Sequence, residues 1–426
     1  MKYISTRKKS PPLGFSECVE ASIAPDGGLY VPERFPEFES KDFNGLNTLP
    51  EIAERLLTPF LENDPLRGSL REICDEVFTF PITLRKLAVP AGMPDTSVLE
   101  LFHGPTAAFK DVGARFLAAC LARTKKAGTR TVLVATSGDT GGAVAAAFHG
   151  RPGFEVLILF PKGKVSTRQE QQLTAWGGNV RAFAVRGDFD DCQRVVKQAF
   201  VDEQWRKSRS LVSANSINIG RLLPQCVYYA AASLWYLRQA GCPATGFVIP
   251  TGNLGNAVAA LWARHMGLPL GKIALATNAN RPITDYFDSG VWKPATTVAT
   301  LANAMDVGNP SNMERLLSLY PTVAGLKDNA VTASVPDTAI TATIREAAGH
   351  GEVLCPHTAV AAHVGRMQAT PGWVIVATAH PAKFDTIIEP LIGKKVEVPP
   401  ALADILSRPS KVIEIDSTLD ALGAVL

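Results

Sequence analysis

From about residue 96 onward, short apolar runs alternate regularly with segments of helical periodicity. The apolar runs cover residues 131–135, 155–160, 180–185, 246–249, 272–276 and 373–377, and the helical patterns include residues 188–207 and 221–239. Continuous apolar strands separated by helices are typical of parallel sheets that are covered on both faces. The pattern therefore predicts an α/β protein.

The first 95 residues have a more mixed pattern. A helix is predicted over residues 49–61, with Thr48 as its N-cap and Glu51 completing a capping box. Pro59 is expected to end or kink this helix near its C-terminus. At the other end of the chain, the residues from 398 onward show little pattern and are expected to form a short tail.

Composition narrows the class of protein. Of the 426 residues, 46% are hydrophobic and 19% are charged, which is typical of a globular protein with a substantial core. The formal net charge of +3 is too small to indicate binding to nucleic acid or to a membrane surface. No apolar run reaches the roughly 18 residues that span a bilayer, and the charged first ten residues do not form a secretory signal. Seven dispersed cysteines are typical of reduced thiols, so a cytoplasmic location is expected.

Two glycine-rich turns, Thr136-Ser-Gly-Asp-Thr-Gly-Gly142 and Thr251-Gly-Asn-Leu-Gly-Asn256, each follow an apolar run and open an Ala-rich helical pattern. Glycines let backbone N–H groups approach an anion, and the positive end of the following helix adds to the attraction. The alternative is an ordinary strand-to-helix turn. Asp139 complicates the first turn, because a carboxylate repels a phosphate and is also common at helix N-termini.

Lys110 follows Phe109 in a mostly apolar stretch. Most lysines are solvated surface charges, but burial lowers the pKa of a lysine, and a neutral amine is what imine formation requires. A sheltered amine together with two anion-binding turns suggests an enzyme that holds an aldehyde-bearing phosphate cofactor beside a second phosphorylated molecule.

Two further segments follow predicted strands. Asn215, Ser216 and Arg221 are suited to hold a carboxylate or a phosphate, although an Asn/Ser-rich turn with a surface Arg is the simpler interpretation. Thr378 is suited to donate to a ring nitrogen or to cap a helix. The histidines show no metal-ligand spacing, so no metal site is expected.

Ten segments in order resemble the threonine synthase family, which uses pyridoxal 5'-phosphate on a fold of the tryptophan-synthase-β type. The N-terminal part is similar to the bacterial and fungal branch. The matching segments begin at residues 14, 24, 103, 135, 187, 215, 252, 277, 303 and 378 and cover nearly the whole chain. The resemblance implies a fold type II enzyme with two parallel-sheet α/β domains and an additional N-terminal region. It implies an N-terminal region over 1–95, a large cofactor-binding domain over 96–112 and 218–426, and a small domain over 113–217.

The resemblance also implies a role for each candidate residue. Lys110, next to Phe109, would form an imine with the cofactor, and Asp139 would lie near the cofactor's 3-hydroxyl. Thr378 would face the pyridine nitrogen. The cofactor phosphate would be held by Gly252, Asn253, Leu254, Gly255 and Asn256. The phosphate and carboxylate of the substrate would be held by Thr136, Ser137, Thr140, Asn215, Ser216 and Arg221.

The implied reaction converts O-phospho-L-homoserine and water to L-threonine and phosphate. A phosphate-releasing lyase that gives 2-oxobutyrate and a non-catalytic phosphometabolite-binding protein remain alternatives. A monomer or simple homodimer is expected, without nucleic-acid or membrane partners. Ala107, Arg281 and Cys355 depart from the residues usual in the family, and each is expected to affect packing or substrate fit.

Overall fold

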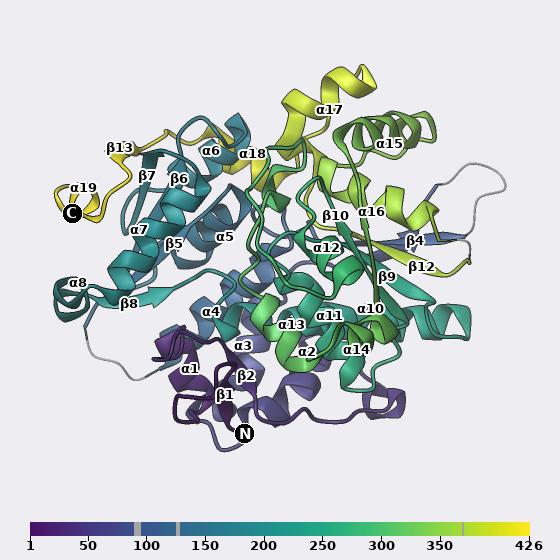
Figure 1. The fold of residues 1–426 in the computed structure, drawn as a ribbon, viewed down its shortest axis with the longest axis horizontal. Coiled ribbons are helices and arrows are strands. Elements are labelled where there is room, and N and C mark those ends of the chain that lie inside the picture. The colour runs from purple at the N-terminus through teal and green to yellow at the C-terminus, as the bar shows by residue number, and fades with distance from the viewer. Residues whose placement is uncertain (89–94, 125–127, 369) are drawn as a thin grey trace.

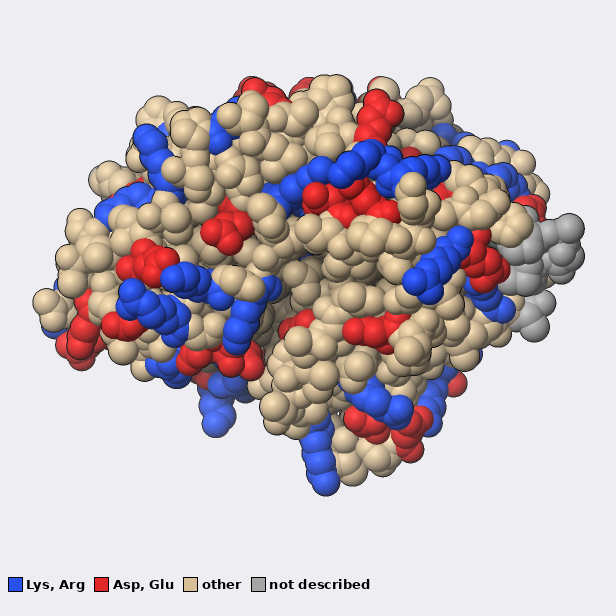
Figure 2. All heavy atoms as spheres, turned by 90° about the horizontal axis from the view of Figure 1, so that it is seen from above, with Lys and Arg blue, Asp and Glu red and all other residues tan. Residues whose placement is uncertain are grey.

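The computed structural model describes residues 1–88, 95–124, 128–368 and 370–426 (Figure 1). These residues form two parallel sheets with helices on both faces and a smaller two-stranded unit near the N-terminus. Within the described ranges, no helix has both the length and the apolar character needed to cross a bilayer. Figure 2 shows acidic and basic side chains interspersed on one face, consistent with the small net charge.

The larger sheet has six strands in the order β11-β10-β9-β12-β4-β3, and all neighbours are parallel except β3 and β4. Its strands are β3 (Thr83–Lys86), β4 (Thr96–Glu100), β9 (Gly246–Pro250), β10 (Lys272–Thr277), β11 (Ala330–Ser334) and β12 (Trp373–Ala377). Side chains alternate between two covered faces. Phe247 and Ile249 join the core under α10 (Gln225–Ala240) and α11 (Gly255–His265), while Val248 joins the core under α16 (Pro356–Arg366). Burial on both faces explains why these strands appear as unbroken apolar runs.

The smaller sheet has five parallel strands in the order β13-β7-β6-β5-β8. They are β5 (Arg130–Ala135), β6 (Phe154–Pro161), β7 (Val180–Arg186), β8 (Ser210–Ser213) and β13 (Val412–Asp416). Val132 and Val134 face the core shared with α4 (Lys110–Arg123) and α5 (Asp139–Phe148), whereas Leu133 faces the core beneath α7 (Phe189–Val201). The two sheets therefore use the same arrangement of layers.

The helices connect these strands. Around the larger sheet lie α10 (Gln225–Ala240), α11 (Gly255–His265), α12 (Pro282–Ser289), α13 (Met313–Leu319), α14 (Val323–Asn329), α15 (Asp337–Gly349), α16 (Pro356–Arg366) and α17 (Asp385–Ile392), with the 3-10 turns η4 (Asn303–Met305) and η5 (Pro381–Phe384). Around the smaller sheet lie α4 (Lys110–Arg123), α5 (Asp139–Phe148), α6 (Thr167–Thr174), α7 (Phe189–Val201), α8 (Glu203–Ser208), α9 (Ile219–Leu222), α18 (Pro400–Ser407) and α19 (Leu419–Gly423).

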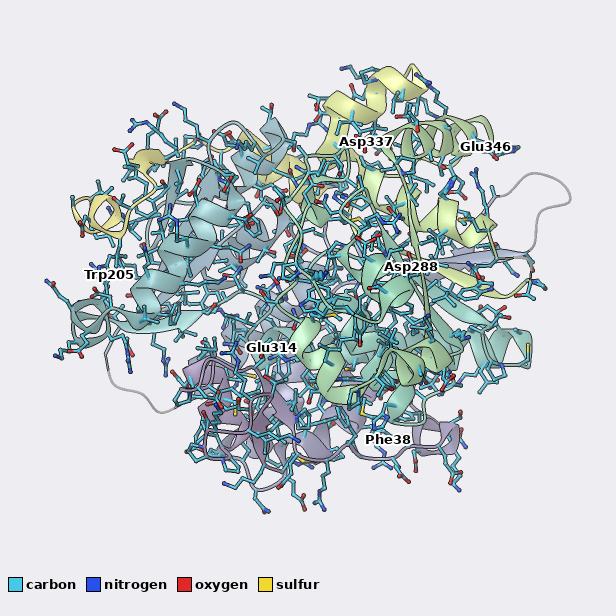
Figure 3. The ribbon with its side chains drawn as sticks, in the orientation of Figure 1. Phe38, Trp205, Asp288, Glu314, Asp337 and Glu346 are labelled. Carbon is cyan, nitrogen blue, oxygen red and sulfur yellow. The ribbon has the colours of Figure 1, made fainter. Side chains whose placement is uncertain are left out.

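The N-terminal region packs against α4 and α10. It contains β1 (Tyr3–Ser5) paired antiparallel with β2 (Tyr30–Pro32), the helices α1 (Phe15–Ala21), α2 (Leu49–Leu57) and α3 (Leu70–Val77), and the 3-10 turns η1 (Ser40–Phe43), η2 (Thr58–Leu61) and η3 (Pro65–Ser69). The ring of Phe15 contacts Phe116 of α4 at a centroid distance of 6.2 Å. Glu314 of α13, labelled in Figure 3, accepts from Thr6 at 2.8 Å and pairs with Arg7 at 2.6 Å, so the segment that follows β1 is held to α13.

The predicted strands and the α/β class are confirmed, but several helix boundaries were wrong. The helix predicted over 188–207 is interrupted at Asp202, whose carboxylate accepts from Trp205 N–H at 2.9 Å and caps a second helix. The helix predicted over 221–239 is broken before Pro224, which is the N-cap of α10. The helix predicted over 49–61 ends at Leu57 and continues as the 3-10 turn that holds Pro59, and Glu51 accepts from Thr48 N–H at 2.9 Å as predicted.

The expectation of a patternless tail was wrong. Residues after 398 form α18, β13 and α19, and β13 pairs with β7 in parallel over Val412–Asp416. This places β13, near the end of the chain, in the smaller sheet. The resemblance had implied that all of 218–426 belongs to the large domain. Similarly, β3 belongs to the larger sheet although it precedes residue 95. Residues 89–94, beside the predicted domain boundary, lie outside the described residues.

Candidate active site

One cavity lies where the ends of several parallel strands meet. Strands β5, β8, β9 and β12 end at Ala135, Ser213, Pro250 and Ala377, and the segments that follow them supply most of the lining. Ligands of open parallel sheets bind at this edge because the strand ends converge there with helix N-termini. Every site residue predicted from the sequence lines the cavity, namely Phe109, Lys110, Thr136, Ser137, Asp139, Thr140, Asn215, Ser216, Arg221, Gly252, Asn253, Leu254, Gly255, Asn256 and Thr378.

Lys110 is the first residue of α4, and its amine is partly sheltered in this cavity. Burial lowers the pKa of Lys110 to about 8; nearby Asp139 opposes this shift, and Lys383 adds to it. A substantial fraction of the amine is therefore neutral slightly above neutral pH. The Nζ atom lies 5.4 Å from the ring centroid of Phe109, which forms part of the apolar flank.

The loop from Gly252 to Asn256 joins β9 to α11 and turns sharply. Leu254 adopts a left-handed conformation with φ 63°, which costs a non-glycine residue ~1–2 kcal/mol. A Cβ atom on Gly252 would lie 2.7 Å from the Cα of Met305, so only glycine fits beneath that segment. The first N–H groups of α11 have no partner within the helix, so this end is suited to bind an anion.

Asn256 completes the same loop. Its Oδ1 atom accepts from the hydroxyls of Tyr228 and Tyr229 at 2.6 and 2.8 Å, which fixes the side chain. Its Nδ2 atom is buried and has no partner among the described residues. A buried donor without a partner is costly, so this atom is suited to a ligand oxygen.

Replacing Gly252 with Ala is expected to weaken cofactor retention about tenfold or more, because overpacking at a site without free space costs ~1–3 kcal/mol. Equilibrium titration with the cofactor, followed by absorbance, measures this loss. The matched control is Gly68→Ala, where a new Cβ atom meets nothing within 4 Å. Equal affinities of the two variants would contradict a tight loop around the phosphate.

Arg221 also lines the cavity. It is only 3% exposed, and among the described residues it forms no ion pair with a carboxylate. One Nη atom donates to the carbonyl of Ala214, while the buried Nε atom has no partner. Burial lowers the pKa of Arg221 to about 10, which still leaves it charged at neutral pH. Although Asp111 raises the pKa of Arg221, the cavity contains a buried cation that forms no ion pair within the described part of the chain.

The hydroxyl and amide groups of Thr136, Asn215 and Ser216 differ in how much of their hydrogen-bonding capacity is already used. Thr136 Oγ1 donates to Gly138 O and accepts from two backbone N–H groups, so its hydroxyl is fully used in holding the turn. Asn215 is tied to the backbone of Ala135. Ser216 Oγ accepts from Asn253 Nδ2 at 3.0 Å, which links the two anion-binding segments and leaves the serine hydrogen free to donate.

Sequence reasoning missed several groups at this site. His357 of α16 lines the cavity, and burial lowers its pKa to about 4, so the ring is neutral with Nε2 accepting from Ala304 N–H at 3.1 Å. Asp139 Oδ1 pairs with Lys383 at 2.8 Å and accepts from Gln169 at 3.0 Å. The segments containing His357 and Lys383 were noticed in the sequence, but neither side chain was given a role. The described residues contain no cluster of three or more His, Cys, Asp or Glu arranged to hold a metal ion.

The three departures from the family pattern all lie outside the cavity lining. Cys355 is buried and caps α16, where its sulfur accepts from Thr358 N–H at 3.4 Å. Ala107 has φ 55° and packs against Leu402 of α18. Arg281 forms exposed ion pairs with aspartates of α12. They affect local packing and capping rather than the walls of the site.

The arrangement fits a cofactor that bears both an aldehyde and a phosphate, because a partly neutral lysine lies in one cavity with a glycine-containing loop at a helix N-terminus. Residues 82–379 match the family model described as pyridoxal-phosphate dependent enzyme. Fold and site thus define a pyridoxal-phosphate-dependent enzyme. Residues 2–78 match the model for the threonine synthase N terminus, and residues 358–426 match the C-terminal model of threonine synthase. The chain belongs to the threonine synthase family, so its activity is that of a threonine synthase.

Full-length relatives agree with this assignment. The threonine synthase of Serratia marcescens is 39% identical over 95% of this chain and 94% of its own length. The threonine synthase of Haemophilus influenzae is 38% identical over 97% of this chain and 96% of its own. Among solved structures, threonine synthase from Escherichia coli superposes with a TM-score of 0.91 and 36% identity, covering 100% of this chain and 99% of that chain. Pyridoxal-phosphate-bound threonine synthase from Brucella melitensis gives a TM-score of 0.89 at 34% identity, covering 100% and 98%.

Proposed function

We propose that the chain converts O-phospho-L-homoserine and water to L-threonine and phosphate at this cavity, with Lys110 as the lysine that attaches the cofactor. The observation that carries the proposal is that Lys110 lines one cavity together with two regions suited to bind an anion, the Gly252–Asn256 loop and Arg221. A cofactor phosphate needs only one of them. The second is suited to the phosphate or carboxylate of the substrate.

The residues that would hold pyridoxal phosphate are those with free donors on one side of the cavity. The backbone of Gly252–Asn256 and the unpartnered Nδ2 of Asn256 would bind its phosphate. Thr378, directly after β12, would donate to the ring nitrogen, and Asp139 would lie near the 3-hydroxyl. When bound, the cofactor withdraws electrons from the substrate carbons attached to it.

The chain's own residues would bind, orient and move protons. Arg221 would form a two-pronged contact with a substrate anion, supported by the hydroxyls of Ser137, Thr140 and Ser216. Lys110, with a pKa of about 8, would accept the α-proton when neutral and return a proton later in the cycle. The aromatic and aliphatic walls, including Phe109 and Met305, would restrict water to the position where it adds.

Product analysis with O-phospho-L-homoserine tests the proposal. Purified protein loaded with the cofactor is expected to form threonine and phosphate in equal amounts. Formation of 2-oxobutyrate without threonine would support the lyase alternative. Absence of turnover despite tight binding of the phosphorylated compound would support a non-catalytic binding protein.

Three further expectations extend this proposal. We propose that residues 1–95 form an N-terminal region, that 96–112 together with 218–426 form the large domain, and that 113–217 form the small domain, with two exceptions: β3 belongs to the larger sheet and β13 to the smaller sheet. We propose a cytoplasmic location, which the seven free cysteines support. We also propose a monomer or simple homodimer, which light scattering can measure.

A further inference from the structure

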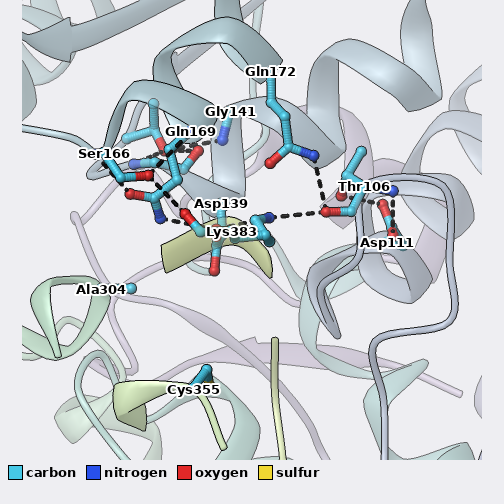
Figure 4. Close-up of polar contacts among 12 residues, drawn as sticks. Thr106, Asp111, Asp139, Gly141, Ser166, Gln169, Gln172, Ala304, Cys355 and Lys383 are labelled. Atoms are coloured by element: carbon cyan, nitrogen blue, oxygen red, sulfur yellow. Dashed lines mark hydrogen bonds and ion pairs between the residues drawn. The ribbon is translucent and has the colours of Figure 1, made fainter. Parts of the chain in front are cut away.

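Lys383 is a second buried lysine beside the active site. It belongs to η5, its side chain is 0% exposed, and it is not part of the cavity lining. Its Nζ atom pairs with Asp139 Oδ1 at 2.8 Å and donates to the carbonyl of Thr106 at 2.8 Å (Figure 4). A fully buried ammonium is costly unless paired, so its position beside Asp139 has a physical reason.

The surroundings fix both partners of this ion pair. Gln169 of α6 donates to the same Asp139 oxygen at 3.0 Å, and Ser166 Oγ donates to the carbonyl of Lys383 at 2.9 Å. The Thr106 carbonyl also accepts from Gln172 at 3.0 Å (Figure 4). The pair thus joins α5 and α6 of the small domain to the segment that follows β12.

Asp139 and Lys383 carry opposite charges and have opposite effects on the pKa of Lys110. Asp139 raises the pKa of Lys110, whereas Lys383 lowers it. Burial alone would raise the pKa of Asp139, but the positive charges of Lys383 and Lys110 hold that pKa well below its usual range. Other titratable groups that interact with these three are Arg221, the buried His357 and Cys355, Asp111 beside Thr106, and His380.

We propose that Lys383 is a positioning residue: it holds Asp139 in place as a carboxylate and offsets its negative charge, so that the cavity keeps a free amine on Lys110. Without Lys383, Lys110 would be the remaining cation with the strongest effect on the pKa of Asp139 and would become the partner of Asp139. A protonated, ion-paired Lys110 neither attacks an aldehyde nor accepts a proton. The inference rests on the proposed role of Lys110 as the lysine that attaches the cofactor.

The test measures the pKa of the Lys110 amine in the full-length chain without bound cofactor. Competitive acetylation over a pH series, followed by mass spectrometry of the Lys110 peptide, gives this value. In Lys383→Met the pKa of Lys110 is expected to rise, and each unit of rise lowers the neutral fraction at pH 7 about tenfold. In Asp139→Asn it is expected to fall, because Lys383 then acts unopposed.

Three additional variants keep the test decisive. The double variant Lys383→Met with Asp139→Asn leaves no unpaired buried charge, and its Lys110 pKa is expected to lie between those of the single variants. Lys383→Arg keeps the charge and is expected to restore the Lys110 pKa of the unaltered chain. Gln169→Leu is the matched control, because it removes a hydrogen bond to Asp139 without changing any charge, and it is expected to shift the pKa least.

A merely structural role gives a different result. If the variants only loosen the site and admit water, Lys383→Met, Asp139→Asn and Gln169→Leu all raise the pKa of Lys110 toward its ordinary value, and the inference is overturned. Borohydride labelling of the cofactor-loaded chain separates this failure from failure of the proposed function. If the label is on Lys110 but Lys383→Met and Asp139→Asn do not shift the pKa of Lys110 in opposite directions, only the role of Lys383 is wrong. If the label is on another residue, the assignment of Lys110 is wrong.

Discussion

Lys110→Ala is expected to reduce threonine formation by ~10⁴-fold or more, because the variant loses the covalent attachment of the cofactor and the group that moves the α-proton. The loaded variant is also expected to lack the visible absorption of the unaltered chain. Phosphate release from O-phospho-L-homoserine and an absorption spectrum measure the two effects. The structural basis of this expectation is that Lys110 lines the cavity and that burial lowers its pKa to about 8.

Lys383→Ala is a useful comparison, because it also removes a sheltered lysine from the same region. Borohydride treatment followed by peptide mapping should place the cofactor on Lys110 in the unaltered chain. In Lys383→Ala any label should also be on Lys110 but in a smaller amount, because the Lys110 amine is then expected to be protonated more of the time. Lys383 does not line the cavity and is already paired with Asp139, so it is not a substitute for the missing amine. A label on Lys383 in the unaltered chain would contradict the assignment.

The sheet strands and the lining of the site were predictable because each depends on local sequence. Strands buried on both faces are continuous apolar runs, as in residues 373–377, and the turns that bind anions need glycine at fixed positions. Lys110 stood out because most of the residues around it in the sequence are apolar. These features are encoded within a few residues of each other.

The features that sequence missed depend on contacts between distant segments. Lys383 acquires its environment only when η5 packs against α5 and α6, which lie more than two hundred residues earlier. His357 has no metal-ligand spacing, and its burial comes from the surrounding fold. The strand at Val412–Asp416 was missed because four of its five side chains are exposed, and only its pairing with β7 defines it. An edge strand of this kind lacks the apolar run that marks the central strands.

Asp202 and Pro224 show a different type of failure. Both lie inside regions whose apolar spacing continues through them, so periodicity alone predicted one helix where there are two. Their local chemistry indicated the break, because Asp caps a following helix and Pro cannot donate within one. The sequence therefore contains signals for both helix boundaries, but the prediction followed the apolar periodicity instead.

Arg221→Ala is expected to weaken use of the substrate by ~2–5 kcal/mol, which corresponds to a ~30-fold to several-thousand-fold loss in kcat/KM. The reason is that Arg221 is a buried cation with an unpartnered Nε atom and no carboxylate partner among the described residues. A substrate anion would supply the missing counter-charge through a two-pronged contact. Steady-state kinetics with O-phospho-L-homoserine measure the loss, and most of it is expected in KM.

Cofactor retention distinguishes this result from general damage to the cavity. The Gly252–Asn256 loop binds the cofactor phosphate in our assignment, so Arg221→Ala should keep the cofactor while losing the substrate. Arg221→Lys retains the charge but not the planar fork, and should recover only part of the activity. Arg315→Ala is the contrasting variant, because its guanidinium donates to the carbonyls of Ser216 and Ile217 and holds the segment that supports both regions. Loss of cofactor in Arg221→Ala to the same extent as in Arg315→Ala would mean that Arg221 acts by holding that segment in place, and the second anion site would then have to be sought elsewhere in the cavity.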